Sequence, residues 1–170
     1  MIRVYLELGS NIMPERNLDL ALDHLEKAVK LEKISTVYRT VPIGRYSNFF
    51  YNCVVSCLTD LDPLSLKQKV IAPIEAGMGR PVQGRKQADR TIDIDLLIYD
   101  DIVSRELNLP HEDIFKKPFV AVGLCEIDPD LRIFPTFKTP CEISSEMDRS
   151  GMVPLQEFTG RLRLKHIRKV

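Results

Sequence analysis

The sequence predicts an α+β domain whose core is a ferredoxin-like βαββαβ unit, an antiparallel sheet with helices packed on it. Two segments alternate apolar and polar side chains with the period of a strand, and two more are rich in apolar and β-branched residues. Two others repeat apolar residues with the period of a helix. Their order along the chain is strand, helix, strand, strand, helix, strand, which is that of the ferredoxin-like unit. The 170 residues are enough for one core, so we predict a single domain over residues 1–170.

The first strand and the first helix have clear signals. Apolar and polar side chains alternate over residues 2–8, and the Gly-Ser-Asn break at residues 9–11 ends the strand. From Pro14 the spacing becomes helical, and Pro14 and Glu15 suit a first turn. The apolar face of this helix consists of Leu18, Leu22, Leu25 and Val29.

The middle of the chain predicts two strands and the second helix. Residues 34–40 and 51–58 are rich in apolar and β-branched side chains, which favours strands. Asp62 and Pro63 supply a cap and a first-turn proline for a helix that ends at the glycines near residue 78. Pro73 lies inside this helix, and we expect it to kink the last turn because it removes a backbone hydrogen bond.

The last strand of the unit follows a basic loop. Residues 80–90 are polar and lack periodicity, which predicts a loop, whereas residues 91–99 form the clearest strand of the sequence. In this strand Ile92, Ile94, Leu96 and Ile98 alternate onto one face, which we predict to be the core face.

The C-terminal part, about residues 136–170, is predicted to combine helix and strand. The second half of 113–127, just before it, and part of 139–150 are predicted to be helical. Residues 161–166 alternate basic residues with leucine, which predicts an edge strand with a basic outer face.

Composition argues against several classes of partner. Lysine plus arginine equals aspartate plus glutamate at 24 each, so no global field favours nucleic acid or a membrane surface. No apolar run approaches the roughly 18 residues of a membrane span, and Met1 leads straight into the first strand, so we predict no signal peptide.

The four cysteines are predicted to be reduced. Cys53 and Cys57 would lie about 13 Å apart on one strand, beyond disulfide reach, and no pair among Cys53, Cys57, Cys125 and Cys141 has zinc-finger spacing. Reduced cysteines that act as small apolar residues are typical of a cytoplasmic protein, which is the location that we predict.

Two carboxylates are the central chemical feature. Because the isoleucines and Leu96 around them define a core face, Asp93 and Asp95 share the opposite face, with Cα atoms about 7 Å apart. Carboxylates at this spacing repel each other unless a cation lies between them, and Mg²⁺ prefers such oxygen ligands together with substrate phosphates. The alternative interpretation is a solvated strand face with two charges.

Basic residues flank this pair. Arg80, Arg85, Lys86 and Arg90 belong to the preceding loop, and His111 follows the strand. Phosphoryl transfer needs positioning, metal ions and fixed positive groups, which a carboxylate pair beside a basic loop would supply. A merely solvated loop is the alternative, and no Walker-type phosphate loop is present.

At this point the residues resemble the 6-hydroxymethyl-7,8-dihydropterin pyrophosphokinase family. The resemblance covers roughly residues 2–135, and its strength lies in the order and spacing of motifs that are modest one by one. The matching residues are Leu8-Gly9-Ser10-Asn11, Ser35, Tyr38-Arg39-Thr40, Pro42 to Gly44, Phe50-Tyr51-Asn52, Glu75, Gly79-Arg80, Arg90-Thr91-Ile92-Asp93-Ile94-Asp95-Leu96-Leu97, Leu109-Pro110-His111, Phe119 and Glu126-Ile127-Asp128-Pro129.

The resemblance implies Mg²⁺-dependent transfer of pyrophosphate from ATP to the hydroxymethyl oxygen of the pterin, with release of AMP, in folate biosynthesis. Asp93 and Asp95 match the ligands of two Mg²⁺ ions, and the catalytic residues implied are Arg80, Arg90 and Asp95. The residues implied for the nucleotide are Glu75, Arg80, Arg90, Leu96, His111 and Lys117. Those implied for the pterin are Thr40, Val41, Ile43, Phe50, Asn52 and Phe119.

Some positions depart from the family pattern. Pro81 and Val82 stand where a second loop arginine is usual, the chain has no tryptophan to close over the pterin, and Lys117 replaces an arginine. A catalytically weak homologue that binds pterin or nucleotide is therefore an alternative, and an RNA-binding ferredoxin-like module is another. We predict a monomer with small-molecule substrates and without nucleic-acid or membrane partners.

Overall fold

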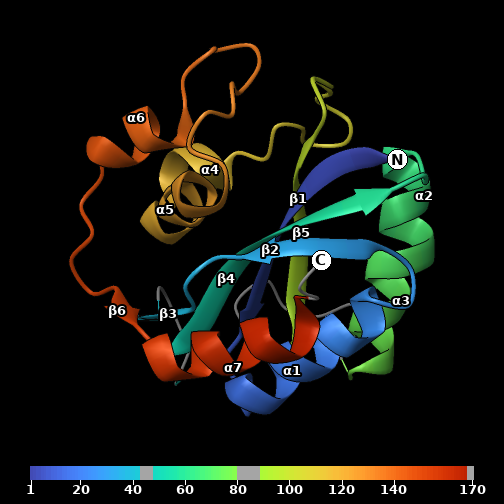
Figure 1. Cartoon of the computed structure of the whole chain (residues 1–170), viewed down its shortest axis with the longest axis vertical. Helices are drawn as coiled ribbons and strands as arrows, with labels where there is room; N and C mark the ends of the chain where they lie inside the picture. The colour runs from blue at the N-terminus through green and yellow to red at the C-terminus, as the bar shows by residue number, and fades with distance from the viewer. Residues whose placement is uncertain (43–47, 80–88, 168–170) are drawn as a thin grey trace.

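The computed structural model describes residues 1–42, 48–79 and 89–167. One sheet lies between two groups of helices, with α1, α3 and α7 on one face and α4, α5 and α6 on the other (Figure 1). A separate apolar cluster fills the space on each side of the sheet. Within the described part of the chain, no helix has the length and apolar character needed to cross a membrane.

The sheet has six strands in the order β5-β1-β4-β3-β6, with β2 also paired to β4, and each of these pairings is antiparallel. The α+β class and the antiparallel sheet predicted from the sequence are confirmed. The strands are β1 (Ile2–Ser10), β2 (Lys30–Ile34), β3 (Tyr38–Thr40), β4 (Phe50–Thr59), β5 (Asp93–Tyr99) and β6 (Val153–Pro154).

The prediction of one strand over residues 34–40 is wrong, because β2 begins earlier and a break at residues 35–37 separates it from β3. Side chains from the two helical layers capture the backbone at this break. The Thr36 N–H donates to Glu126 Oε2 at 2.7 Å, and the Val37 N–H donates to Thr159 Oγ1 at 2.9 Å. These bonds satisfy N–H groups that a continuous strand would use in its ladder.

The register of β1 and β5 contains an irregularity that the sequence does not reveal. Tyr5 pairs with Ile98, whereas the next residue, Leu6, pairs with Leu96. Ile98 consequently packs in the cluster around Tyr5, on the face opposite Ile94 and Leu96. The prediction that Ile98 shares their face is wrong, because one extra residue in a strand reverses the alternation beyond it.

On the first face, α1 (Pro14–Leu25) packs beside a segment made of α2 (Pro63–Leu66), a π-helical turn (Lys67–Ile71) and α3 (Ala72–Gly77). The Ala72 N–H donates to the Lys67 carbonyl, one residue further back than in an α-helix. Pro73 follows directly and has no N–H to continue the regular pattern. The π-helical turn thus lies directly before Pro73, and the kink expected in the last turn stays a prediction.

The last segment, α7 (Gln156–His166), contradicts the predicted edge strand over residues 161–166. Phe158, Leu162 and His166 are buried at helical spacing, whereas Leu164 is 80% exposed. Six residues that alternate basic and apolar side chains were too short a window to separate the two periods.

The second face carries α4 (Asp113–Lys116), α5 (Pro118–Ile127) and α6 (Pro140–Ser145). Both predicted helical regions are confirmed, and Thr139 and Glu142 form a capping box at the start of α6. A disulfide joins Cys125 of α5 to Cys141 of α6, so the prediction that all four cysteines are reduced is wrong. The cysteines Cys53 and Cys57 are free and buried. The argument for a cytoplasmic location thus loses one of its premises.

Candidate active site

The chemically distinctive residues lie on the α5 face of the three adjacent strands β4, β1 and β5. Strand pairing places them in two neighbouring rows across the sheet. The rows are Asn52, Gly9 and Asp93, followed by Val54, Glu7 and Asp95. Residues two apart in a strand share a face, so this patch brings the predicted metal pair and the predicted pterin amide together.

Asp93 and Asp95 lie on this face, as predicted, and both are partly accessible. Asp93 Oδ2 forms an ion pair with Arg90 Nη1. Burial raises the pKa of Asp95, and the negative charge of Asp93 raises it further. A bound divalent cation would relieve both effects, so the donor set fits Mg²⁺.

Asn11 of the Gly-Ser-Asn segment holds the chain that enters β5. Its Oδ1 accepts the Arg90 N–H at 2.6 Å, and its Nδ2 donates to Asp89 Oδ1 at 2.7 Å. The Asn11 N–H also donates to the Arg90 carbonyl at 3.1 Å. The sequence had assigned no role to Asn11, which here fixes the position of Arg90 relative to the two aspartates.

Glu75 supports the aspartate pair from α3. Its Oε1 accepts the backbone N–H of Ile94 at 2.8 Å, between Asp93 and Asp95. Since β5 is an edge strand of the sheet, an N–H that no neighbouring strand pairs needs another acceptor. Glu75 therefore positions the strand that carries the carboxylates.

His111, Asp113 and Lys117 cover the patch from the helical side. The His111 N–H is bonded to the Leu97 carbonyl at 2.8 Å, which anchors this segment to the end of β5. Its Nδ1 accepts the Asp113 N–H at 3.2 Å, so the proton of a neutral ring lies on Nε2, 3.8 Å from Asp95 Oδ1. Asp95, His111 and Asp113 form a compact cluster, and Asp113 is a residue that the sequence analysis missed.

Lys117 supplies positive charge above the patch, where the family resemblance had implied a nucleotide contact. Its Nζ lies 2.8 Å from Asp113 Oδ2. Burial by itself lowers the pKa of Lys117, but the Asp113 hydrogen bond and the charges of Glu7, Asp113 and Asp95 outweigh it and raise the pKa. Lys117 therefore carries its charge into a site rich in carboxylates.

The predicted pterin residues gather beside this charged patch. The Asn52 Nδ2 donates to Thr40 Oγ1 at 2.9 Å, and both residues are buried. Phe119 is half-buried at the start of α5, with Lys117 Nζ 5.9 Å from its ring centroid. Phe50 is half-buried at the start of β4, whereas Val41 is 59% exposed just beyond β3.

A carboxylate on α5 connects these two sides of the site. Glu126 accepts the Thr36 N–H at its Oε2 and the Tyr38 hydroxyl at its Oε1. Tyr38 begins β3, which also contains Thr40, and α5 also contains Phe119. Glu126 thus fixes the strand that carries Thr40 against the helix that carries Phe119.

Not every predicted residue can be placed in the site. Ile43, Arg80, Arg85 and Lys86 lie outside the described residues. Leu96 is 1% exposed and packs in the core on the opposite face, so its side chain does not reach the patch.

Glu7 is the most informative residue that the sequence-based prediction of the site left out. It is 6% exposed and lies in the centre of the patch. Burial raises its pKa well above the ordinary value, with further contributions from the charges of Asp95 and Asp93. In the sequence it passes for the solvent side of a half-buried strand. The strand order was the signal that could have predicted the burial of Glu7. The first strand of a ferredoxin-like unit lies in the centre of the sheet, where both of its faces can be covered.

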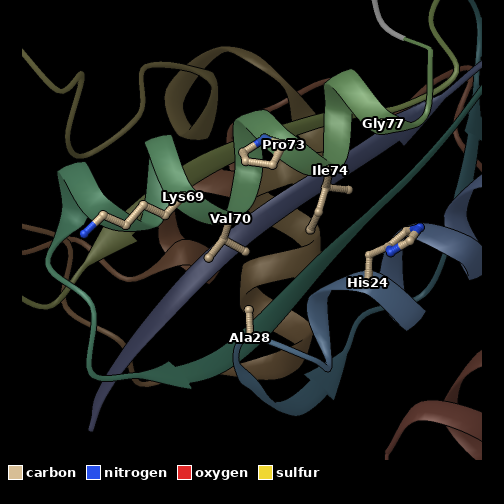
Figure 2. Close-up of a pocket in the computed structure, with 7 residues that line it drawn as sticks. All are labelled: His24, Ala28, Lys69, Val70, Pro73, Ile74 and Gly77. Atoms are coloured by element: carbon tan, nitrogen blue, oxygen red, sulfur yellow. The ribbon is translucent and has the colours of Figure 1, made fainter.

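A hollow lies on the other face of the sheet and does not share these residues. It is a groove of about 280 Å³ between α1 and the helical segment that ends in α3 (Figure 2). Apolar side chains such as Val70 and Ile74 line it together with His24, and none of the predicted site residues contributes.

A family model and related proteins point to the same enzyme family. A family model described as 7,8-dihydro-6-hydroxymethylpterin-pyrophosphokinase matches residues 5–129. The chain is 38% identical over 158 residues to the 2-amino-4-hydroxy-6-hydroxymethyldihydropteridine pyrophosphokinase of Methylorubrum extorquens, which covers 89% of this chain and 98% of that protein. The enzyme of the same name from Aquifex aeolicus is 38% identical over 144 residues, 82% of this chain and 88% of that one.

Solved structures agree on the fold. Plasmodium falciparum HPPK-DHPS, crystallised with STZ-DHP, superposes with a TM-score of 0.67 at 16% identity, over 99% of this chain and 46% of that one. The present chain therefore spans less than half of that longer protein, and at this identity the likeness concerns the fold alone. The sequence-based prediction of a pyrophosphokinase is confirmed by the relatives: the chain belongs to the 7,8-dihydro-6-hydroxymethylpterin pyrophosphokinase family.

Proposed function

We propose that this chain transfers pyrophosphate from ATP to the hydroxymethyl group of 6-hydroxymethyl-7,8-dihydropterin on the β4-β1-β5 face. The reaction releases AMP and is a step of folate biosynthesis. One observation carries the proposal. The carboxylates Asp93 and Asp95 share a face with Asn52, while His111 and Lys117 lie over the same patch. A cation site, fixed positive charge and a ring pocket are thus adjacent, as phosphoryl transfer to a pterin requires.

Asp93 and Asp95 would hold Mg²⁺, and we propose two ions, as the family resemblance implies. When bound, Mg²⁺ would supply positive charge that neutralises the ATP phosphates and orients them. The protein's own part is preorganisation. Glu75 holds the Ile94 backbone between the two carboxylates, so their spacing is set before substrate arrives.

The triphosphate would lie between the β5 carboxylates and the basic side chains. Arg90 is fixed by Asn11 next to Asp93, where its guanidinium can turn from a carboxylate to a phosphate oxygen. His111 Nε2 and Lys117 Nζ approach from the opposite side and would contact phosphate oxygens. We also assign the nucleotide to the backbone of Leu96 and to Arg80, as the resemblance implies.

The pterin would bind at the Asn52 end of the patch. Phe50 and Phe119 would stack on the flat ring, and Asn52 with the backbone of Thr40 would read its polar edge. Val41 and Ile43 complete this proposed pocket. The hydroxymethyl arm would then point along β1 toward Asp95, which places the attacking oxygen beside the cation site.

Three coarser expectations complete the proposal. The strand order β5-β1-β4 with β2 beside β4 supports the ferredoxin-like arrangement of the core. We keep the prediction of a monomeric protein without a nucleic-acid partner, since the exposed side of β5 presents carboxylates that would repel phosphate in the absence of a metal. A cytoplasmic location also stays a prediction.

AMP release tests the proposal directly. The protein is incubated with 6-hydroxymethyl-7,8-dihydropterin, ATP and Mg²⁺, with an Asp95→Ala variant as the control. Release of AMP well above the control, dependent on both pterin and Mg²⁺, is expected. If no AMP forms while calorimetry still detects pterin binding with a nonhydrolysable ATP analogue, the chain is a binding homologue without turnover, the alternative that the absent tryptophan and second loop arginine suggest.

A further inference from the structure

Glu7 is a carboxylate without a partner in the middle of the candidate site. It is 6% exposed, and among residues 1–42, 48–79 and 89–167 no side chain or backbone group donates a hydrogen bond to it or pairs with it. A largely buried carboxylate of this kind is costly to the fold unless water or a ligand completes its hydrogen bonds. None of the roles assigned above uses Glu7.

The surroundings of Glu7 show where its oxygen is directed. A Cβ built on Gly9 would lie 3.2 Å from Glu7 Oε1 and 2.8 Å from Asn52 Oδ1. Two acceptor oxygens therefore flank the same point above Gly9, which has no side chain to fill it. The Asn52 amide is oriented by its Nδ2 bond to Thr40, so its Oδ1 is fixed toward this point. A donor that reaches this point would satisfy both oxygens, and a bound molecule can bring it.

The position of Glu7 along β1 indicates which chemical group of a ligand could donate a hydrogen bond to it. Glu7 pairs with Asp95 on one side and lies two residues from Gly9, which pairs with Asn52. It therefore occupies the junction between the proposed ring pocket and the cation site. The part of the substrate that crosses this junction is the hydroxymethyl arm, which ends in an O–H group.

We propose that Glu7 contacts the substrate directly and accepts a hydrogen bond from the 6-hydroxymethyl group of the pterin. This inference rests on the proposed function and adds a specificity-determining residue to it. The contact would select pterins that carry the reactive hydroxyl over those that lack it, because an unfilled buried carboxylate beside a methyl group is unfavourable. It would also hold the oxygen near Asp95.

The test measures the coupling between Glu7 and the substrate hydroxyl by binding alone. Calorimetry with Mg²⁺ and a nonhydrolysable ATP analogue gives the Kd of 6-hydroxymethyl-7,8-dihydropterin and of 6-methyl-7,8-dihydropterin. The wild type is expected to prefer the hydroxymethyl compound by about tenfold or more. Glu7→Leu, which removes both oxygens, should bind the two compounds within about twofold, and Glu7→Gln should lie between these values.

Tyr5→Phe is the matched control, since Tyr5 lies on the same strand and face but bonds to Asp128, away from the patch. It should keep the full wild-type preference. Thermal unfolding separates a functional from a structural role: Glu7→Leu should raise the midpoint, because an unpartnered buried carboxylate is lost, whereas a structural residue would lower it.

Wild-type preference in a folded Glu7→Leu protein, or in Glu7→Gln if the leucine variant does not fold, would overturn the inference. So would a wild type that binds both pterins equally. AMP release distinguishes these results from failure of the proposed function, because AMP is then formed by the wild type although Glu7 has no part in selecting the hydroxyl.

Discussion

Two histidine–carboxylate clusters in this protein look alike in composition and differ in how completely their groups are paired. The site cluster is Asp95, His111 and Asp113, and the terminal cluster is Asp19, Asp23 and His166. In the terminal cluster the ring nitrogens of His166 lie 2.6 Å from Asp19 Oδ1 and 2.8 Å from Glu26 Oε1. In the site cluster His111 Nε2 is 3.8 Å from Asp95 Oδ1, too far for a hydrogen bond.

The difference teaches how a structural cluster can be told from a functional one. The His166 side chain is fully buried, and Lys165 adds bonds to Asp19 and Asp23, so the terminal cluster joins α7 to α1 and leaves nothing for a ligand to complete. Asp95, by contrast, lies near other carboxylates, and its His111 neighbour is too far away to form a hydrogen bond with it. Its pKa is raised. Groups kept in such an environment are stabilised by a cation and substrate rather than by the fold.

Changing one residue in each cluster gives the largest contrast. Asp95→Asn keeps the shape of the side chain but removes charge from the proposed Mg²⁺ site, so AMP release should fall by about 10³-fold. Unfolding should be unchanged or occur at higher temperature, because like-charge repulsion with Asp93 is relieved. His166→Gln should leave the rate of AMP release within about twofold, as judged from initial rates. Loss of activity in the histidine variant alone would invert the assignment of the two clusters.

The stabilisation of the fold by bound ligand compares the two clusters by a measurement that does not depend on turnover. Mg²⁺ with a nonhydrolysable ATP analogue at about 100 times its Kd should stabilise the wild type by about 2.7 kcal/mol. For a chain of this size that corresponds to a rise of roughly 5–10 °C in the unfolding midpoint. The rise should disappear in Asp95→Asn and persist in His166→Gln. An unchanged rise in Asp95→Asn would remove that carboxylate from the metal site.

The terminal cluster should show its effect in stability. His166→Gln leaves Asp19 and Glu26 without their buried partner, and we expect a loss of about 2 kcal/mol, or roughly 4–8 °C in the midpoint. His24→Gln is a suitable control, since His24 lies on α1 without an ion pair among the described residues. Equal midpoints for the two variants would mean that the cluster does not hold α7 on the domain.

The same comparison explains what the sequence could and could not predict. Alternation around Asp93 and Asp95 was sufficient to place the two carboxylates on one face, because the irregularity in β5 lies beyond them and leaves the pairing of Asp93 with Gly9 and of Asp95 with Glu7 regular. His166 and Asp19 are far apart in the chain and meet only because α7 packs on α1, which the predicted edge strand excluded. Glu7 was missed for a related reason, since its burial depends on which strands become its neighbours.

The corrected elements have the same cause. The break between β2 and β3 depends on Glu126 and Thr159, residues from two later helices. The Cys125–Cys141 disulfide depends on α5 packing against α6, and neither helix's position can be read from cysteine spacing. Periodicity therefore predicted the elements with long regular patterns, and contacts distant in sequence decided the rest.

The smallest expected effect is the acid dependence of the terminal cluster. Burial by itself raises the pKa of Asp19, but hydrogen bonds with Lys165 and His166 outweigh it and lower the pKa below its ordinary value of 3.8. Because the folded-state pKa is the lower one, the contribution of Asp19 is fully present above the unfolded-state pKa and is lost as the pH falls through the folded-state pKa. The Asp19 side chain is 37% exposed, so screening by solvent limits this contribution to a few tenths of a kcal/mol.

Chemical denaturation of the wild type and Asp19→Asn between pH 2 and pH 7 measures that contribution. The two proteins should differ at neutral pH and converge at the acid end, because protonation makes the wild-type side chain as neutral as asparagine. Asp23→Asn provides the neighbouring control, as its nearest contact with the His166 ring is 3.9 Å and it should shift the curve less. A difference between wild type and Asp19→Asn that is constant down to pH 2 would mean that packing, and not charge, joins Asp19 to α7.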